Sequence, residues 1–113
     1  MNLEELKSKA GAAEALLKAV ANRNRLIILC ELLHGEVSVT KLQQAIHLSQ
    51  SALSQHLARL RADKLVSTRR ESQTIHYSLA SHEVKELIEL LYRLYCAPEC
   101  AKPPATKTKR RIS

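Results

Sequence analysis

The sequence predicts one mainly α-helical domain that carries a single β-hairpin. A chain of 113 residues is long enough for one small domain and too short for a second, catalytic one. Its apolar residues are mostly Leu, Ile, Val and Ala, with only 2 Gly and no Phe or Trp, which favours helices over a β-sandwich. Apolar residues recur at helical spacing along most of the chain, and strand spacing begins only after Lys64.

Two helices open the chain and are separated near residues 22–24. Apolar residues at helical intervals indicate the first, namely Leu3, Leu6, Ala10, Ala13, Leu17 and Val20. The second has the same spacing in Leu26, Leu29, Cys30 and Leu33. We expect Gly35 to end this second helix, because glycine is common just past a helix C-terminus.

Two further helices follow, joined by a tight turn at residues 45–49. Ser38 is placed to cap the first of them, because a serine side chain accepts hydrogen bonds from the free N–H groups of a helix start. Ser49 is placed in the same way to cap the second. We expect that second helix to cover about residues 50–63.

A hairpin and a last helix complete the predicted domain. Residues 65–70 and 74–79 are rich in β-branched side chains and predict two strands, with residues 71–73 as their turn. Ser81 is placed to cap a helix that runs to about residue 96. Its apolar stripe is wide and consists of Val84, Ile88, Leu91 and Tyr95, with Leu87 and Leu94 beside them.

The charge balance favours a polyanionic partner. Lys and Arg number 18 against 11 Asp and Glu, a formal net charge of +7. Glu4 and Glu5 stand where a secretory signal would be basic. The longest apolar run, residues 26–30, is far shorter than the roughly 20 residues of a membrane helix. We therefore expect a cytoplasmic protein without a membrane partner.

The domain is expected to cover residues 1–96 and to be followed by a basic, proline-containing tail over residues 97–113. The tail contains all 3 Pro of the chain and five basic residues against one acid. This composition predicts disorder. The tail is either simply solvated or makes non-specific contacts with nucleic-acid phosphates.

The helix over residues 50–63 is the candidate DNA-reading element. A tight helix-turn-helix followed by a basic hairpin is the winged helix-turn-helix arrangement, which fits the major groove. The outer face of this helix is short and polar and comprises Gln50, Ser51, Ser54, Gln55, Ala58 and Arg59. Gln55 could make the bidentate contact that glutamine makes with adenine. The alternative interpretation is an ordinary solvated helix face.

Three residues near the tip of the hairpin complete the candidate DNA interface. They are Arg69, Arg70 and Gln73. An arginine at this place enters the minor groove or pairs with phosphates when the reading helix docks. The alternative is a basic edge that merely protects a strand from aggregation.

The stretch LSQSALSQHLARLRADKLVSTRRESQTIHYSL closely resembles the recognition helix and wing of ArsR-family bacterial repressors. The resemblance covers about residues 12–96. It implies a homodimer built from the first and last helices that binds double-stranded operator DNA. The wide apolar stripe of the last helix fits a dimer, although a helix of one small core is the simpler alternative.

Two metal sites of that family have no full match in this sequence. The first places a cysteine pair before the recognition helix, where this chain has residues 36–42 without a thiol. The second needs acidic and histidine ligands at both ends of the last helix. Here His82 and Glu83 stand at its start, but Tyr92, Arg93 and Tyr95 stand toward its end. We expect neither a metal nor a cofactor.

Cys30 and Cys96 resemble the thiol pair of the persulfide- and redox-responsive branch of the family, that of BigR, SqrR and HlyU. The resemblance implies that a disulfide or polysulfide between these two residues releases DNA, with reactive sulfur species as the inducer. Cys96, at the edge of its helical stripe, is the better candidate for the attacking thiolate. Cys100 has no counterpart in the pattern. The simpler alternative makes Cys30 a small core residue.

Two other functions remain as alternatives. A zinc-responsive repressor would use Cys30, His34, Cys96 and Cys100, although Pro98 places Cys100 beyond the last helix. A DNA-binding dimer without an inducer would need none of these residues. An enzyme is not expected, because the sequence has no phosphate loop, nucleophile elbow or paired carboxylates.

Overall fold

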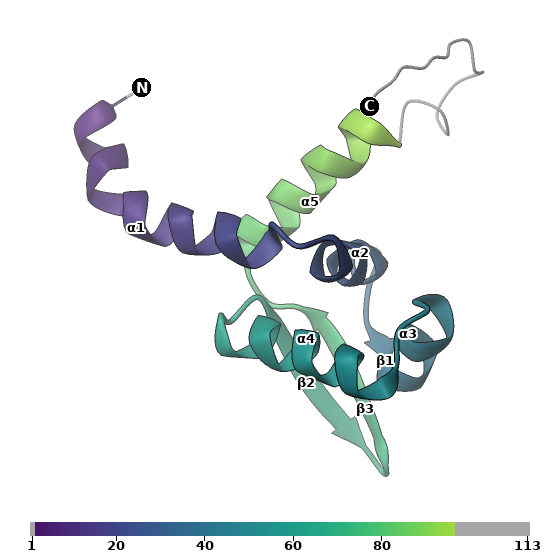
Figure 1. The fold of residues 1–113 in the computed structure, drawn as a ribbon. Coiled ribbons are helices and arrows are strands. Elements are labelled where there is room, and N and C mark those ends of the chain that lie inside the picture. The colour runs from purple at the N-terminus through teal and green to yellow at the C-terminus, as the bar shows by residue number, and fades with distance from the viewer. Residues whose placement is uncertain (1, 97–113) are drawn as a thin grey trace, which may run out of the picture.

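The computed structural model describes residues 2–96 and forms the mainly helical domain with a hairpin that the sequence predicts (Figure 1). In chain order the elements are α1 (Leu3–Val20), α2 (Arg23–Glu31), β1 (Val37–Ser38), α3 (Val39–Ala45), α4 (Gln50–Ala62), β2 (Val66–Glu71), β3 (Thr74–Leu79) and α5 (His82–Tyr95). The tail over residues 97–113, including Cys100, lies outside the described residues.

The serine caps are confirmed at all three helices for which they were predicted. The hydroxyl oxygens of Ser38, Ser49 and Ser81 each accept a hydrogen bond of 3.1 Å from a backbone N–H three residues on. These short-range bonds fix where α3, α4 and α5 begin. The boundaries of the reading helix therefore follow from its local sequence.

The second helix ends before Gly35, so the prediction that Gly35 ends it is wrong. Helix α2 ends at Glu31, because the N–H groups of Leu32 and Leu33 bond the carbonyls three residues back, at 3.1 Å each, and tighten the last turn. Gly35 instead has φ of 137°, a conformation that favours glycine, where the chain turns from this end into β1.

The sheet has three antiparallel strands in the order β1, β3, β2. Strand β1 was not predicted; its Val37 and Ser38 pair with Tyr77 and His76 of β3. The hairpin turn is shorter than predicted, because Glu71 is the last residue of β2 and pairs with Thr74. The turn is therefore only residues 72–73.

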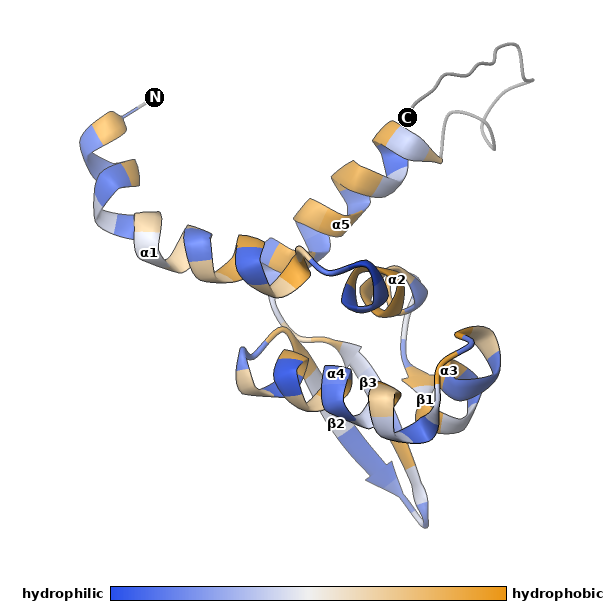
Figure 2. Cartoon of the chain, viewed as in Figure 1, coloured by the Kyte–Doolittle hydropathy of each residue, from blue (hydrophilic) through white to orange (hydrophobic). Residues whose placement is uncertain are grey.

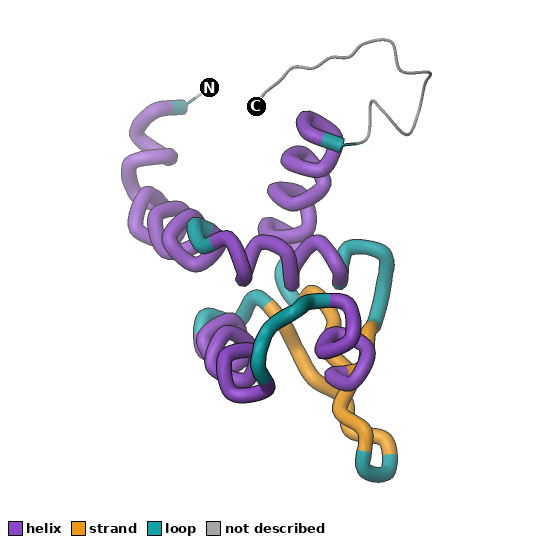
Figure 3. Tube along the Cα trace, turned by 45° about the vertical axis from the view of Figure 1, so that its right-hand side comes forward, coloured by secondary structure: helices purple, strands orange, loops and turns teal. Residues whose placement is uncertain are grey.

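The core lies between the helices and one face of the sheet. Its largest fully buried side chains are Ile28, Leu29, Leu32, Leu42, Leu53, Leu60, Val84 and Ile88. Helices α1 and α5 extend from this core on the side away from the hairpin, as two views show (Figures 1 and 3). Among the described residues, no helix is both long and apolar enough to cross a membrane.

Candidate nucleic-acid interface and thiol pair

Helix α4 has the two faces that the sequence predicts. Leu53, Leu57 and Leu60 are buried in the core. The predicted outer residues are all exposed, namely Gln50, Ser51, Ser54, Gln55, Ala58 and Arg59. The helix therefore presents short, hydrogen-bonding side chains to solvent. Arg59 forms an ion pair with Asp63 one turn on, with its Nε 2.8 Å from Oδ2 of Asp63.

The turn between α3 and α4 is held by hydrogen bonds. The side-chain amide of Gln43 donates to the carbonyl of Leu48, and the Leu48 N–H donates to the carbonyl of Ile46 at 2.7 Å. The C-terminal part of α3 is thus tied to the short loop that leads into α4. A fixed angle between these helices is what docking into a groove requires.

Strand alternation separates the two wing arginines. Arg70 pairs with Ile75 in the register, so the two residues share a face of the hairpin with the buried Tyr77. This face packs onto the core on the side of α4 (Figure 1). Arg69 pairs with His76 and lies on the opposite face. Only Arg70 therefore projects on the side of the reading helix.

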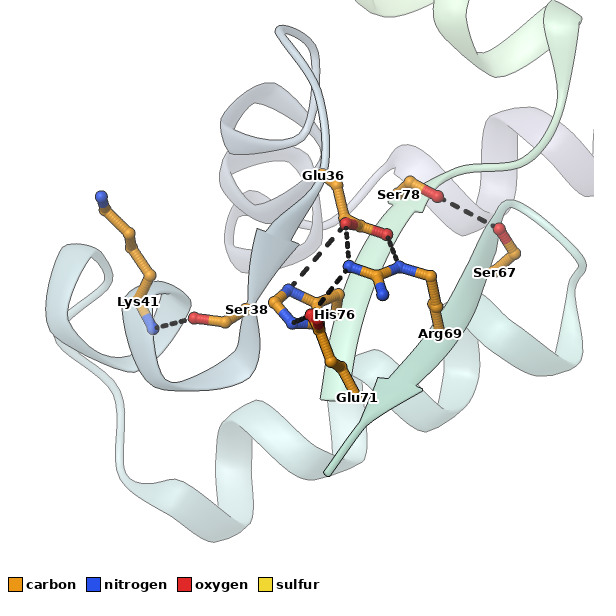
Figure 4. Close-up of polar contacts among 8 residues, drawn as sticks. All are labelled: Glu36, Ser38, Lys41, Ser67, Arg69, Glu71, His76 and Ser78. Atoms are coloured by element: carbon orange, nitrogen blue, oxygen red, sulfur yellow. Dashed lines mark hydrogen bonds and ion pairs between the residues drawn. The ribbon is translucent and has the colours of Figure 1, made fainter. Parts of the chain in front are cut away.

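Arg69 lies in an ion-pair cluster away from the tip where it was expected (Figure 4). Its guanidinium forms a bidentate pair with Glu36, with Nε 2.9 Å from Oε2 and Nη2 2.8 Å from Oε1. This hydrogen bonding lowers the pKa of the Glu36 carboxyl and raises the pKa of Arg69. Glu71 accepts a longer bond from Arg69, of 3.4 Å. Gln73 remains exposed in the turn.

Glu36 is the residue of this region that sequence analysis missed. It carries no motif, and its partner lies far away along the chain. The only local signal is Gly35 before it, which indicates a turn but not which residue Glu36 will contact.

The thiols of Cys30 and Cys96 are both free, and two helices that pack together carry them. Cys30 is half-buried near the end of α2, whereas Cys96 is exposed at the C-cap of α5. Burial raises the pKa of Cys30 above its usual value, and the charges of Cys96 and Glu31 raise it further. The two thiols are therefore close enough to interact electrostatically, and Cys96 is the more accessible.

A small cleft of about 270 Å³ lies between the ends of α2 and α5. Leu33, His34, Glu89, Tyr92 and Arg93 line it. The rings of His34 and Tyr92 meet edge to face, with centroids 6.2 Å apart. Within residues 2–96, no three His, Cys, Asp or Glu side chains form a group that could hold a metal.

The residues at the start of α5 have structural partners. Oε1 of Glu83 accepts a hydrogen bond from the Ser81 hydroxyl, and bonding at the helix start lowers the pKa of Glu83. His82 is exposed.

Three comparisons place this geometry among known proteins. Residues 22–68 match the model of the bacterial regulatory proteins of the arsR family. The transcriptional activator HlyU of Vibrio cholerae is 59% identical over 85% of this chain and 89% of its own length. The structure of reduced HlyU from Vibrio cholerae has a TM-score of 0.79 at 58% identity, covering 82% of this chain and 98% of that one. The structure of the repressor BigR from Xylella fastidiosa has a TM-score of 0.80 at 36% identity, covering 85% and 98%.

Proposed function

The chain belongs to the ArsR family of bacterial regulatory proteins, and from this premise we propose that it binds operator DNA as a homodimer and releases it when Cys30 and Cys96 become covalently linked. It is a transcriptional regulator and not an enzyme, in line with the names of its relatives. HlyU is named an activator and BigR a repressor, so the proposal concerns occupancy of DNA and not the sign of its effect.

The exposed polar face of α4 supports DNA reading. Gln55 lies near its middle, where a bidentate contact with an adenine edge is available. Gln50 and Ser51 lie in the first turn, where backbone N–H groups attract phosphate. Arg70 on the neighbouring face of the wing adds a phosphate or minor-groove contact.

The apolar residues left exposed on α1 and α5 support a homodimer. On α5, Leu90, Leu94 and Tyr95 are exposed, with Tyr95 at 67%. On α1, Leu3, Leu6 and Leu17 are exposed. Figure 2 shows these apolar segments in orange along both projecting helices. A second copy of the chain packed on these helices would cover the exposed leucines and Tyr95.

The single observation that carries the switch is that α2 and α5, which pack together, carry Cys30 and Cys96 with the Cys96 charge raising the pKa of Cys30. Helix α2 precedes the reading unit, and α5 carries much of the proposed dimer surface. A bond between them changes the angle between the two reading helices of a dimer. Only a small change is needed, because both helices must fit successive grooves about 34–36 Å apart.

The chemistry needs no cofactor. The Cys96 thiolate attacks the sulfane sulfur of a persulfide, forms Cys96–S–SH and releases the donor as a thiol. The Cys30 thiolate then displaces HS⁻ and leaves a disulfide. With a trisulfide donor, Cys96 displaces one donor thiolate and Cys30 the other, so that one sulfane sulfur remains as a bridge. In both routes the protein thiols are oxidised and the donor is reduced.

Selectivity for sulfur donors over peroxide would follow from the spacing of the thiols. An unstrained disulfide needs Cα atoms within about 7 Å of each other. A pair held wider is joined without strain only by a longer sulfur chain. We therefore expect persulfides and polysulfides to induce release more effectively than hydrogen peroxide.

The test is release of DNA by four proteins, the wild type and the variants Cys30→Ser, Cys96→Ser and Cys100→Ser. The probe is a labelled duplex that the reduced wild type selects from a randomised library. Glutathione persulfide should release the wild type and Cys100→Ser, whereas the other two variants should stay bound. Mass spectrometry should find the Cys30–Cys96 link only in the released proteins.

Normal release of Cys30→Ser would overturn the switch and leave Cys30 as a core residue. Equal DNA affinity of the linked and reduced wild type would favour a dimer without an inducer. Because Cys30 packs on the core, Cys30→Ala serves as a second variant if the serine variant melts early.

A further inference from the structure

The outer half of the wing has few attachments to the rest of the molecule. Strand β1 pairs with β3 only at Tyr77 and His76. Beyond that point, residues 70–75 are a two-stranded ribbon that projects past the helices (Figures 1 and 3). An isolated two-stranded ribbon is marginally stable and twists strongly. Its direction therefore depends on side-chain contacts.

Glu36 makes such a contact from outside the hairpin. It follows Gly35 in the loop that joins α2 to β1, and its carboxylate holds Arg69 of β2 by two hydrogen bonds of 2.8 and 2.9 Å. A bidentate arginine–carboxylate pair fixes direction as well as distance. The pair thus links the loop before β1 to the base of the projecting ribbon.

Two neighbours extend this pair into a cluster (Figure 4). Nη2 of Arg69 lies 3.4 Å from Glu71. The ring of His76 lies between both carboxylates, with Nδ1 4.0 Å from Glu36 and Nε2 3.5 Å from Glu71. All three hairpin residues of the cluster lie on the face opposite to Arg70. The cluster therefore holds the hairpin on the face that points away from α4.

We propose that Glu36 and Arg69 are positioning residues for DNA binding, which set the direction of the wing and so hold Arg70 toward the DNA beside α4. This assignment rests on the proposed DNA-binding function. It replaces the expectation that Arg69 itself contacts DNA, because the guanidinium is already held by two hydrogen bonds to Glu36 within the protein.

Arg69 could either contact phosphate or position the wing, and the variant Glu36→Gln should change DNA affinity in opposite directions in the two cases. If Arg69 contacts phosphate and Glu36 competes for it, removal of an acidic charge strengthens DNA binding. If the pair positions the wing, the same change weakens binding although it makes the protein more basic. We expect a loss on the order of threefold to tenfold, in the range of a well-formed exposed ion pair.

The experiment uses the reduced full-length chain and the duplex selected by the wild type. Glu31→Gln is the matched control, since it removes the same charge from the end of α2 and the Glu31 carboxylate has no ion pair among the described residues. Its affinity should not fall. The charge-swapped double variant Glu36→Arg with Arg69→Glu should recover most of the affinity that Glu36→Gln loses.

A second measurement distinguishes positioning from general stability. NMR order parameters of the Ser72 and Gln73 amides should fall in Glu36→Gln, while those of α4 and the melting temperature stay near the wild-type values. Tighter binding by Glu36→Gln, or unchanged binding together with unchanged order at the tip, overturns the proposal. Failure of the wild type to bind any duplex would instead refute the proposed function.

Discussion

Gln55 and Arg70 lie on the same side of the molecule and should act differently on DNA. Gln55→Ala should relax base preference by roughly 1–3 kcal/mol at one position of each half-site, because a bidentate base contact is lost. Arg70→Ala should weaken all sequences about equally and lower the salt dependence by about one phosphate contact. Titration of a panel of single-base variants of the selected duplex measures both effects.

The Gln55 prediction has a clear contrary result. Sequence preference that survives Gln55→Ala, with dimerisation intact, would mean that another exposed residue of α4 reads the base. Ser54 and Ser51 on the same face would then be the residues to replace next.

The two thiols should differ in reactivity in a way that depends on pH. Burial and the nearby Cys96 raise the pKa of Cys30, so at neutral pH it is mostly the unreactive thiol. Iodoacetamide should therefore label the exposed Cys96 before Cys30. Peptide mass spectrometry over pH 6 to 10, in the Cys100→Ser protein, follows each site.

Replacement of Cys96 tests the coupling between the thiols. In Cys96→Ser the labelling profile of Cys30 should move to lower pH, because the negative charge that opposes its ionisation is gone. The shift should be partial, since burial is the larger cause. An unchanged profile would mean that the thiols do not interact in solution.

At the scale of the elements, α4 ends in a strained turn. The N–H of Leu65 bonds the carbonyl of Leu60 at 3.0 Å, and that of Lys64 bonds Arg61 at 2.9 Å. This is the Schellman pattern, which places the residue after the cap in the left-handed region. Lys64 occupies that position with φ of 63°, where glycine is the usual residue.

Lys64→Gly should therefore stabilise the fold. The left-handed conformation costs a lysine about 1–2 kcal/mol, more than the 0.4–1 kcal/mol or so that glycine loses through the greater freedom of the unfolded chain. The net gain should be about 0.5–1 kcal/mol. Urea unfolding at fixed protein concentration measures it, with Lys85→Gly inside α5 as a control that should lose about 1 kcal/mol. A loss of stability in both variants would contradict the inference that Lys64 is strained.

The helices were predictable because their starting signals are local. Ser38, Ser49 and Ser81 act on N–H groups three residues away, and apolar spacing then fixes which side of each helix is buried. Strand β1 was not predictable, since its two residues become a strand only by pairing with β3. The positive φ of Lys64 and Ser72 also breaks the usual residue preference, so the sequence did not indicate which residue of either turn takes this conformation.

In the candidate site, too, the features set by local sequence were predictable and the contacts between distant elements were not. The exposed face of α4 follows from helical geometry, and the structure confirms its exposure. The sequence did not predict that Arg69 is held in an ion-pair cluster, because Glu36 comes from another element. The pairing of Cys30 with Cys96 came from family resemblance, and no local pattern connects two residues so far apart in the chain.

At the scale of the whole molecule, one chain is extended for its size. Its radius of gyration is 15.9 Å, against about 13 Å for a compact domain of about 100 residues. The difference fits the projection of α1 and α5 away from the core (Figure 3). Both helices expose leucines at their outer ends, so a second copy that packs on them would make the assembly compact.

Leu94→Lys tests whether that second copy is needed for DNA binding. Leu94 is 61% exposed in the single chain, and burying a leucine contributes about 1.5–3 kcal/mol. In a two-fold interface the loss counts twice, so the dimer dissociation constant should rise on the order of a hundredfold or more. Analytical ultracentrifugation at micromolar concentration measures this rise directly.

The same variant should bind DNA more weakly although it gains a positive charge. A monomer reaches one half-site and neutralises about half as many phosphates, so the slope of log affinity against log salt should fall to about half. Glu31→Gln, which changes the net charge by the same amount, should keep both the dimer and the slope. A Leu94→Lys protein that binds the selected duplex with an unchanged slope would show that one chain suffices for DNA binding.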